Sequence, residues 1–387
     1  MRRLDERIAE SLHTAARDSR AVAGYTHNYY RYPARFSPLF ASTVIAEFSS
    51  PGDVVLDPFV GGGTTLVEAA LAQRVAIGSD INSLATFVSR VKTTPLVLDE
   101  TAAVRAWLPV AINASGYRHP RKGIAEYMPG PETKNLSGPR ARAIKKAMAA
   151  ILSTSAMLPT DASQNFARCA LLQTGQWALD GRRIAPGVED FRSKFVSVVD
   201  QMLAGMEAYG LALDPDVPQP VVLDEDVRGL ERAQPFGSGR KARLVLTSPP
   251  YTGVHVLYHR WQVDGRRETG APYWLAGCAD GQAASFYTFG SRTPTGEHRY
   301  FDSVGRAFRS IHAVCEYGAH VVQLVAFSEP DRQLGRYLDV MDAAGFDECM
   351  TDVPSREWRC VPNRKWYAMQ KGQTPASREA VLVHSAR

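Results

Sequence analysis

The residues best suited to chemistry form the run Thr247-Ser248-Pro249-Pro250-Tyr251, which follows the apolar stretch 244–246. The Ser248 hydroxyl and the Pro249 carbonyl can accept hydrogen bonds from the two hydrogens of a planar amino group and draw its nitrogen toward a nucleophilic geometry. The prolines fix φ and hold that carbonyl outward. Tyr251 offers an aromatic face for stacking a ring and for stabilising a cation. We therefore predict a catalytic site that activates an exocyclic amino group, with Ser248, Pro249, Pro250 and Tyr251 as its residues.

A second run, Asp57-Pro58-Phe59-Val60-Gly61-Gly62-Gly63-Thr64-Thr65, follows a short apolar strand predicted over 53–57. Glycines let a backbone approach a ligand closely and take up positive φ. A predicted helix over 64–73 and a strand over 75–80 complete the first half of a nucleotide-binding βαβ unit. The glycine spacing differs from GxGxxG, which argues against a dinucleotide.

The acids at the ends of these strands suit the polar groups of S-adenosylmethionine. We expect Asp57 to face its ammonium group and Asp80 to accept hydrogen bonds from its ribose hydroxyls. Asp226, after a predicted strand over 221–224, is either an acceptor for the adenine amino group or a solvated turn carboxylate. The sequence leaves these two interpretations of Asp226 open.

The order of predicted elements indicates an α/β fold with a Rossmann-like, doubly wound parallel sheet that an antiparallel pair closes. In residues 99–213 the alternation of strands and helices stops, and helical patterns follow one another. We interpret this segment as an inserted helical region, a candidate for target recognition. The catalytic domain is then assembled from 1–98 and 214–387. The remaining expected helices are 1–20, 39–48, 141–152, 162–179, 191–209, 301–316 and 331–344, and the remaining strands are 243–247, 320–327, 347–353 and 380–384.

Together, DPFVGGGTT and TSPPY resemble the motifs of the S-adenosylmethionine-dependent DNA amino-methyltransferases, which modify cytosine N4 or adenine N6. The segment 27–38 is similar to the family's stretch along the methionine end of the cofactor. Ser248 resembles the cytosine-N4 members, because adenine-N6 members more often carry Asp or Asn there. The resemblance implies base flipping and cofactor contacts from Phe36, Asp57, Pro58, Phe59, Gly61, Gly63, Thr64, Thr65, Asp80, Asn82 and Asp226.

Three segments mix cations with aromatic side chains and are candidates for holding DNA. In 118–146, eight Lys or Arg residues stand against two Glu, which suits phosphate contacts or, equally, a solvated helical face. The other two lie beside the catalytic run and in a predicted hairpin tip at 358–367. The candidate DNA-binding residues are Arg140, Lys145, Lys146, His255, Tyr258, His259, Arg260, Trp261, Arg364 and Trp366.

The overall composition is compatible with a DNA-binding enzyme but is not specific to one. The net charge of +5 permits a polyanionic partner, and five scattered cysteines indicate a reducing cytosol with no disulfide framework or metal site. No signal peptide or membrane span is expected, so the predicted location is the cytoplasm of a bacterial or phage-type, nucleoid-associated enzyme. A cognate restriction endonuclease, the oligomeric state and the recognition sequence are left open.

Four functions remain in competition at this point. The leading hypothesis is a DNA cytosine-N4 methyltransferase, and its nearest rival is a DNA adenine-N6 methyltransferase. An RNA or protein amino-methyltransferase shares similar motifs. A non-catalytic cofactor-binding DNA module would not require both Ser248 and Tyr251.

Overall fold

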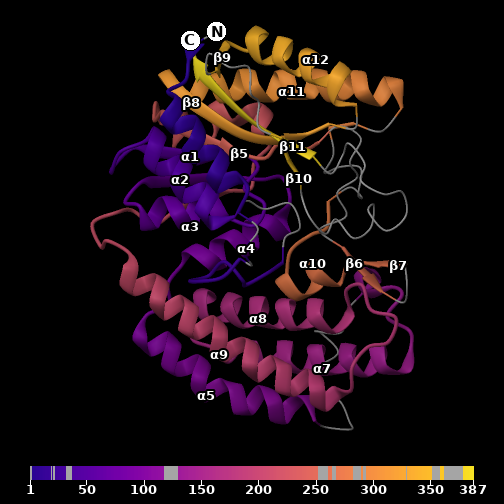
Figure 1. Cartoon of the computed structure of the whole chain (residues 1–387). Coiled ribbons are helices and arrows are strands. Elements are labelled where there is room, and N and C mark those ends of the chain that lie inside the picture. The colour runs from indigo at the N-terminus through magenta and orange to yellow at the C-terminus, as the bar shows by residue number, and fades with distance from the viewer. Residues whose placement is uncertain are drawn as a thin grey trace.

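The computed structural model describes residues 2–18, 20, 22–31, 37–116, 130–251, 260–263, 267–281, 289–290, 293–327, 329–350, 358–360 and 378–387. Within these ranges the chain forms a mainly parallel sheet covered by helices on both faces, above a second layer of helices (Figure 1). No described helix is long and apolar enough to cross a membrane.

The central sheet of the described residues has nine strands, and among them β11 alone runs opposite to the others, so that its pairings with β8, β9 and β10 are antiparallel. The chain runs from β2 outward through β3 to β4, then returns to the other side of β2 to form β5 and β8. The strand order therefore reverses between β2 and β5, and such a switch point is where open α/β sheets bind ligands. In sheet order the strands are β1 (Arg2–Arg3), β9 (Phe346–Met350), β11 (Arg378–Ala386), β8 (Cys315–Ala326), β5 (Ala242–Thr247), β2 (Val54–Asp57), β3 (Val75–Ser79) and β4 (Val221–Leu223), with β10 (Trp358–Cys360) paired to β11.

Alternating side chains of the central strands bury against opposite helical layers. Leu244 and Leu246 pack with α1 (Glu6–Ala16), α2 (Pro38–Phe48) and α3 (Thr64–Leu71). Val245 faces the other layer, formed by α11 (Pro294–Val314), α12 (Pro330–Ala343) and the 3₁₀ helix η2 (Val227–Arg232). This period of two is the strand pattern expected for a sheet buried on both faces.

The helical region between β3 and β4 shares its core with segments outside it. Its long described helices are α5 (Leu98–Ser115), α7 (Pro139–Ser155), α8 (Asp161–Leu179) and α9 (Val188–Ala212). They pack against α4 (Ser83–Thr93), α10 (Ala271–Ala276) and the hairpin of β6 (Trp261–Val263) and β7 (Arg267–Thr269) in one apolar cluster (Figure 1). The helices are therefore continuous in packing with the sheet layer, and division of the chain at 98 and 214 stays a prediction.

The expected elements are found with some shifted ends, and the structure adds β1, α4, α10 and the β6–β7 hairpin, which were not expected. The N-terminal helix is shorter than 1–20, because β1 precedes it and Asp5 caps its first turn. Helix α11 starts seven residues before the expected 301, where the Thr293 hydroxyl accepts from the Gly296 N–H and Pro294 occupies the first turn. Residues 351–353 of the expected strand lie outside the described residues.

Candidate functional site

The two motifs meet at the switch point of the sheet. Strands β2 and β5 are parallel neighbours, with Val55 opposite Leu244 and Leu56 opposite Val245. Their carboxyl ends therefore lie side by side, and each is followed by one of the predicted loops. A direct bond closes the junction, because the Thr247 hydroxyl donates to Asp57 Oδ1 at 2.8 Å.

Asp57 is almost fully buried and is held by three donors from both loops. In addition to Thr247, the Thr65 hydroxyl donates to Oδ2 at 2.7 Å and the Phe59 N–H donates to Oδ1 at 3.2 Å. Burial raises the pKa of Asp57 to about 6, against the lowering effect of these hydrogen bonds. A carboxylate has about four acceptor positions, so this residue joins the loops and keeps capacity for a ligand cation.

Asp80 is half-buried and ties the glycine loop to the end of β3. Its Oδ2 accepts from the Gly61 N–H at 3.0 Å and its Oδ1 accepts from the Asn82 N–H at 2.9 Å. Burial again raises its pKa to about 6. Asn82 caps helix α4 through the Leu84 N–H and accepts from the Tyr273 hydroxyl at 3.2 Å.

The glycine loop is held against helix α4. Gly63 has φ of +71°, and a Cβ there would lie 2.7 Å from Ser89 Oγ. The Ser89 hydroxyl donates to the Gly61 carbonyl at 3.2 Å, and the buried Lys92 ammonium donates to the Gly62 carbonyl. No hydrogen-bond partner is found among the described residues for the buried hydroxyl of Thr64 at the start of α3. Such an orphaned group beside a loop that only glycine fits indicates a ligand site.

The catalytic run forms a compact, partly buried turn. The Tyr251 ring is 8% exposed, and its hydroxyl lies 2.9 Å from Ser248 Oγ. The same hydroxyl donates to Glu379 Oε1 at 3.0 Å, from a side chain on β11 that is only 2% exposed. From helix α11, the Tyr300 hydroxyl donates to the Pro250 carbonyl at 2.9 Å. Pro249 is buried and Ser248 is half-exposed, so Ser248 is the accessible polar group of the turn.

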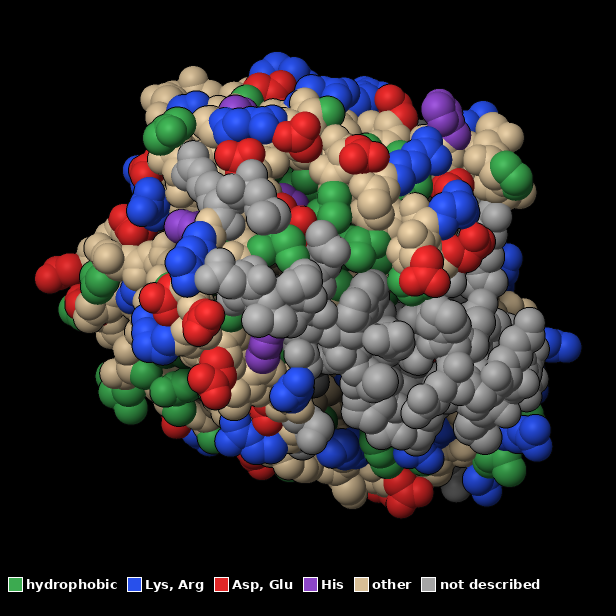
Figure 2. Space-filling view, turned by 45° about the horizontal axis from the view of Figure 1, so that its top comes forward, with side chains coloured by type: hydrophobic (Ala, Val, Ile, Leu, Met, Phe, Trp, Pro, Cys, Tyr) green, Lys and Arg blue, Asp and Glu red, His purple; other side chains and the backbone are tan. Residues whose placement is uncertain are grey.

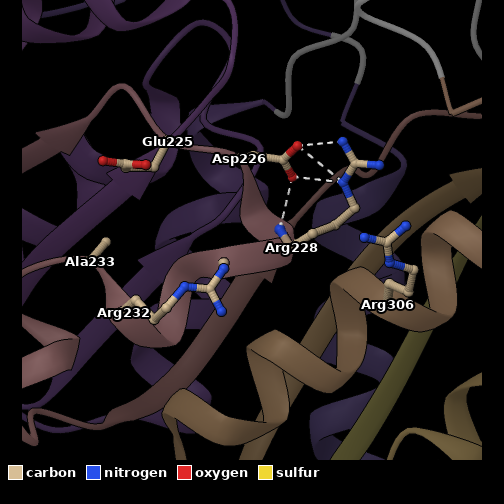
Figure 3. Close-up of a pocket in the computed structure, with 7 residues that line it drawn as sticks. Glu225, Asp226, Arg228, Arg232, Ala233 and Arg306 are labelled. Atoms are coloured by element: carbon tan, nitrogen blue, oxygen red, sulfur yellow. Dashed lines mark hydrogen bonds and ion pairs between the residues drawn. The ribbon is translucent and has the colours of Figure 1, made fainter.

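Asp226 does not end a strand but caps the 3₁₀ helix η2. It accepts from the Arg228 backbone N–H at 2.9 Å and forms an ion pair with the Arg228 guanidinium, which lowers the pKa of the carboxyl. The two residues line an open cavity of about 420 Å³ together with Glu225, Arg232 and Arg306 (Figure 3). The acid at the end of β4 is instead Asp224, which accepts from Thr86 and Arg90.

The described candidates for DNA contact fall into two groups. Arg140 and Lys146 are exposed and Lys145 is half-buried on helix α7, where they remain available. Arg260 is ion-paired with Asp280 at 2.7 Å and is largely buried. Figure 2 shows Lys and Arg side chains interspersed with Asp and Glu over one face, so the basic residues seen there do not form one continuous positive patch.

The prediction that Trp261 contacts DNA is wrong. Its side chain is 1% exposed, its indole N–H donates to the Tyr30 hydroxyl at 3.1 Å, and its ring fills the space beside Gly175. It therefore belongs to the core of the helical layer and offers no face to DNA. The other predicted contacts, His255, Tyr258, His259, Arg364, Trp366 and the cofactor residue Phe36, lie outside the described residues.

Sequence reasoning did not select Glu379, Tyr300 or Thr65 for roles at the catalytic turn or in holding Asp57. Glu379 is the most consequential of these, and a weak signal for it existed: it is a lone acid at the head of the otherwise apolar stretch 380–383. Its meeting with Tyr251 depends on the antiparallel register that places Glu379 opposite Ala326 of β8. The Tyr300 bond likewise joins segments that are far apart in the sequence, whereas Thr65 and Asp57 belong to one loop whose local conformation closes their bond.

Comparison with solved structures gives low overall similarity. The chain aligns with TrmN from Thermus thermophilus at 12% identity and a TM-score of 0.35, covering 94% of this chain and 52% of that one. It aligns with the rRNA methyltransferase AviRa from Streptomyces viridochromogenes at 9% identity and a TM-score of 0.33, covering 92% and 89%.

Sequence comparison matches parts of the chain to known methyltransferases. A family described as DNA methylase matches residues 11–86. The type II methyltransferase M.MvaI of Kocuria varians is 31% identical over 103 residues, which are 24% of this chain and 23% of that protein. M.BsoBI of Geobacillus stearothermophilus is 45% identical over 56 residues, 14% and 11% of the two chains. The match thus spans less than a quarter of either relative.

The segment that matches contains the glycine loop and Asp80, whose geometry at the switch point is described above. The Rossmann-like sheet and S-adenosylmethionine as the cofactor, both expected from the sequence, agree with this match. Residues 11–86 thus match the DNA methylase family, and the relatives that match parts of the chain are type II and orphan methyltransferases.

Proposed function

We propose that this protein transfers a methyl group from S-adenosylmethionine to the exocyclic N4 amino group of cytosine in DNA. The observation that carries the proposal is the bond from Thr247 to Asp57, which places the accessible Ser248 hydroxyl beside the glycine loop. A cofactor loop and an amino-activating turn are thereby held at one sheet edge. The named relatives are DNA methyltransferases, which supports DNA as the substrate.

The residues present fit the proposed cofactor. Burial raises the pKa values of Asp57 and Asp80, and a cation placed beside Asp57 would restore the ionised form of that carboxyl. The orphaned Thr64 hydroxyl and the glycine backbone supply a further donor and close approach. Bound there, the cofactor would supply an electrophilic methyl group. Asp57 would face the ammonium group, and Asp80 and Asn82 the ribose; Asp226 is the candidate for the adenine amino group.

The chemistry left to the protein is positioning of the amino nitrogen. The Ser248 oxygen and the Pro249 carbonyl accept its two hydrogens and reduce delocalisation of the lone pair into the ring. The Tyr251 ring provides a face against which a flipped base stacks. Alignment of nucleophile and methyl donor accounts for most of the rate enhancement, because the donor is already reactive.

The choice of cytosine over adenine rests on Ser248. Ser248 occupies the position before Pro-Pro-Tyr, where cytosine-N4 enzymes carry serine. Its neutral hydroxyl accepts an amino hydrogen less strongly than a carboxylate at that position would. Adenine N6 is the alternative product. The helix α7 cations Arg140, Lys145 and Lys146 are proposed to contact phosphates, which add affinity without sequence information.

Transfer of radiolabelled methyl groups to competing acceptors tests the class of substrate. Purified protein is incubated with labelled cofactor and, in parallel, with DNA, RNA and a protein mixture. We expect label in DNA alone, and its loss in Ser248→Ala, which keeps the fold and the glycine loop. Label in RNA or protein but not DNA, or equal labelling by Ser248→Ala, would overturn the proposal.

A further inference from the structure

We propose that Glu379 is a positioning residue that makes Ser248 a hydrogen-bond acceptor for the substrate and takes up the proton that the reaction releases. This inference rests on the proposed amino-methylation and assigns it a residue on β11, far in sequence from the catalytic run. Its basis is the row of three side chains Ser248, Tyr251 and Glu379, joined at 2.9 and 3.0 Å.

The direction of these bonds follows from proton counting. Tyr251 has one hydroxyl proton and donates it to Glu379 Oε1. Its oxygen is therefore an acceptor toward Ser248, and the bond at 2.9 Å is made by the Ser248 proton. Because that proton points toward Tyr251, Ser248 Oγ presents a lone pair on its other side and meets an incoming N–H as an acceptor. If Tyr251 donated its proton to Ser248 instead of to Glu379, Ser248 would point its own proton toward the substrate amino group.

Burial makes this orientation effective. Glu379 and the Tyr251 ring are shielded from solvent, and hydrogen bonds in low dielectric polarise one another along a chain. A carboxylate at the far end thus increases the accepting strength of the Ser248 oxygen. The same bond fixes the plane of the Tyr251 ring, and Tyr300 fixes the turn from its other side through the Pro250 carbonyl.

The hydrogen bonds from Ser248 through Tyr251 to Glu379 also provide a path for the proton that the amino group loses. When the amino nitrogen has bonded to the methyl carbon, and the carbon–sulfur bond pair has passed to sulfur, the nitrogen carries a positive charge and one proton to lose. That proton passes to Ser248 Oγ, the serine proton passes to Tyr251, and the phenolic proton passes to Glu379. Glu379 ends as a neutral carboxylic acid, and both hydroxyls are regenerated.

A double-mutant cycle tests this assignment. Glu379→Gln keeps the shape and removes the charge, and Tyr251→Phe keeps the aromatic face and removes the link. In single-turnover methylation of DNA, we expect each variant to lose about 10- to 100-fold in rate, the range typical of residues that orient a functional group. The double variant should be no slower than the slower single variant, and the Kd for S-adenosylhomocysteine and the KM for DNA should stay within about twofold of wild type.

Glu348→Gln, the same change at a half-buried acid of neighbouring β9, is the matched control and should retain the wild-type rate. A wild-type rate in Glu379→Gln, a raised KM with unchanged rate, or effects that multiply in the double variant would overturn the assignment. If Glu379→Gln does not fold, Tyr251→Phe replaces it as the test, and a wild-type rate in that variant contradicts the assignment equally. Absence of methylation by the wild type would instead contradict the proposed function itself.

Discussion

The Thr247 hydroxyl donates a 2.8 Å hydrogen bond to Asp57, although the two residues are 190 positions apart in the chain. Thr247 opens the catalytic run and Asp57 opens the glycine loop. Because both side chains are buried at the switch point of the sheet, neither loop can shift without breaking this bond. The spacing of the two loops is therefore set by the sheet itself.

Thr247→Val removes this bond while keeping the shape of the side chain. Loss of one donor from a buried carboxyl should lower the free energy of unfolding by about 1–3 kcal/mol, measured by urea denaturation. The methyl-transfer rate should fall by about 10-fold through misplacement of the loops. Thr174→Val is the control, because among the described residues that buried hydroxyl bonds to the Ala170 carbonyl of its own helix α8. Equal transfer rates in the two variants would contradict the coupling.

Gly63→Ala should damage the cofactor loop by two independent effects. The residue has positive φ, and the new Cβ would lie 2.7 Å from Ser89 Oγ. Gly52→Ala is the control for backbone strain: its φ is +87°, but no atom of the described residues lies within 4 Å of the new Cβ. Titration with S-adenosylhomocysteine should show about a 10-fold or greater loss of affinity in Gly63→Ala. Unchanged affinity there would show that the loop does not hold the cofactor.

The pH dependence of cofactor binding follows from Asp57 and Asp80. Burial raises both pKa values from 3.8 to about 6, so their contribution to apo-protein stability is complete below about pH 3.8 and lost as pH rises through 6. A cationic ligand reverses this loss by stabilising the ionised forms. The rise in Tm on adding S-adenosylmethionine should therefore be larger at pH 7.5 than at pH 5.5. An equal or larger rise at pH 5.5 would contradict placement of the cation beside Asp57, and Asp57→Asn should weaken the pH effect.

Salt dependence tests the proposed DNA surface on helix α7. The triple variant Arg140→Gln, Lys145→Gln and Lys146→Gln removes the three proposed cations, of which two are exposed and Lys145 is half-buried. The slope of log Kd against log salt should become shallower by about 0.9 for each phosphate that the variant no longer neutralises, as measured by fluorescence anisotropy. Arg105→Gln, an exposed cation paired with Glu207 on the same helical layer, is the control. If the wild type, the triple variant and Arg105→Gln all gave the same slope, DNA would not contact this surface of helix α7.

The order of strands and helices was predictable because each element is local. Short apolar runs bounded by Gly, Pro and Asp predict buried strands, and both motif loops follow such runs. Since carboxyl ends of parallel strands share an edge, the meeting of Ser248 with the glycine loop also followed from sequence. The antiparallel partner of β8 was predicted for the same reason, from the apolar run in 380–384.

The parts that escaped prediction depend on contacts between distant segments. Glu379 reaches Tyr251 only through the register of β11 on β8. Trp261 lies in a segment rich in cations and aromatics, which indicated a nucleic-acid surface, yet tertiary packing beside Gly175 buries it. The charge pattern around a residue gives no information on which helix covers it. Asp226 is a different case, because its ion pair with Arg228 is local, and the sequence alone did not show that a 3₁₀ turn begins there.

The most direct test of the central claim identifies the methylated base itself. DNA is incubated with the purified protein and S-adenosylmethionine, digested to nucleosides, and analysed by mass spectrometry for N4-methylcytosine and N6-methyladenine. The arrangement of Ser248, Tyr251 and the glycine loop predicts N4-methylcytosine with the wild type and none with Ser248→Ala. N6-methyladenine alone, or neither modified base from folded protein that binds the cofactor, would contradict it.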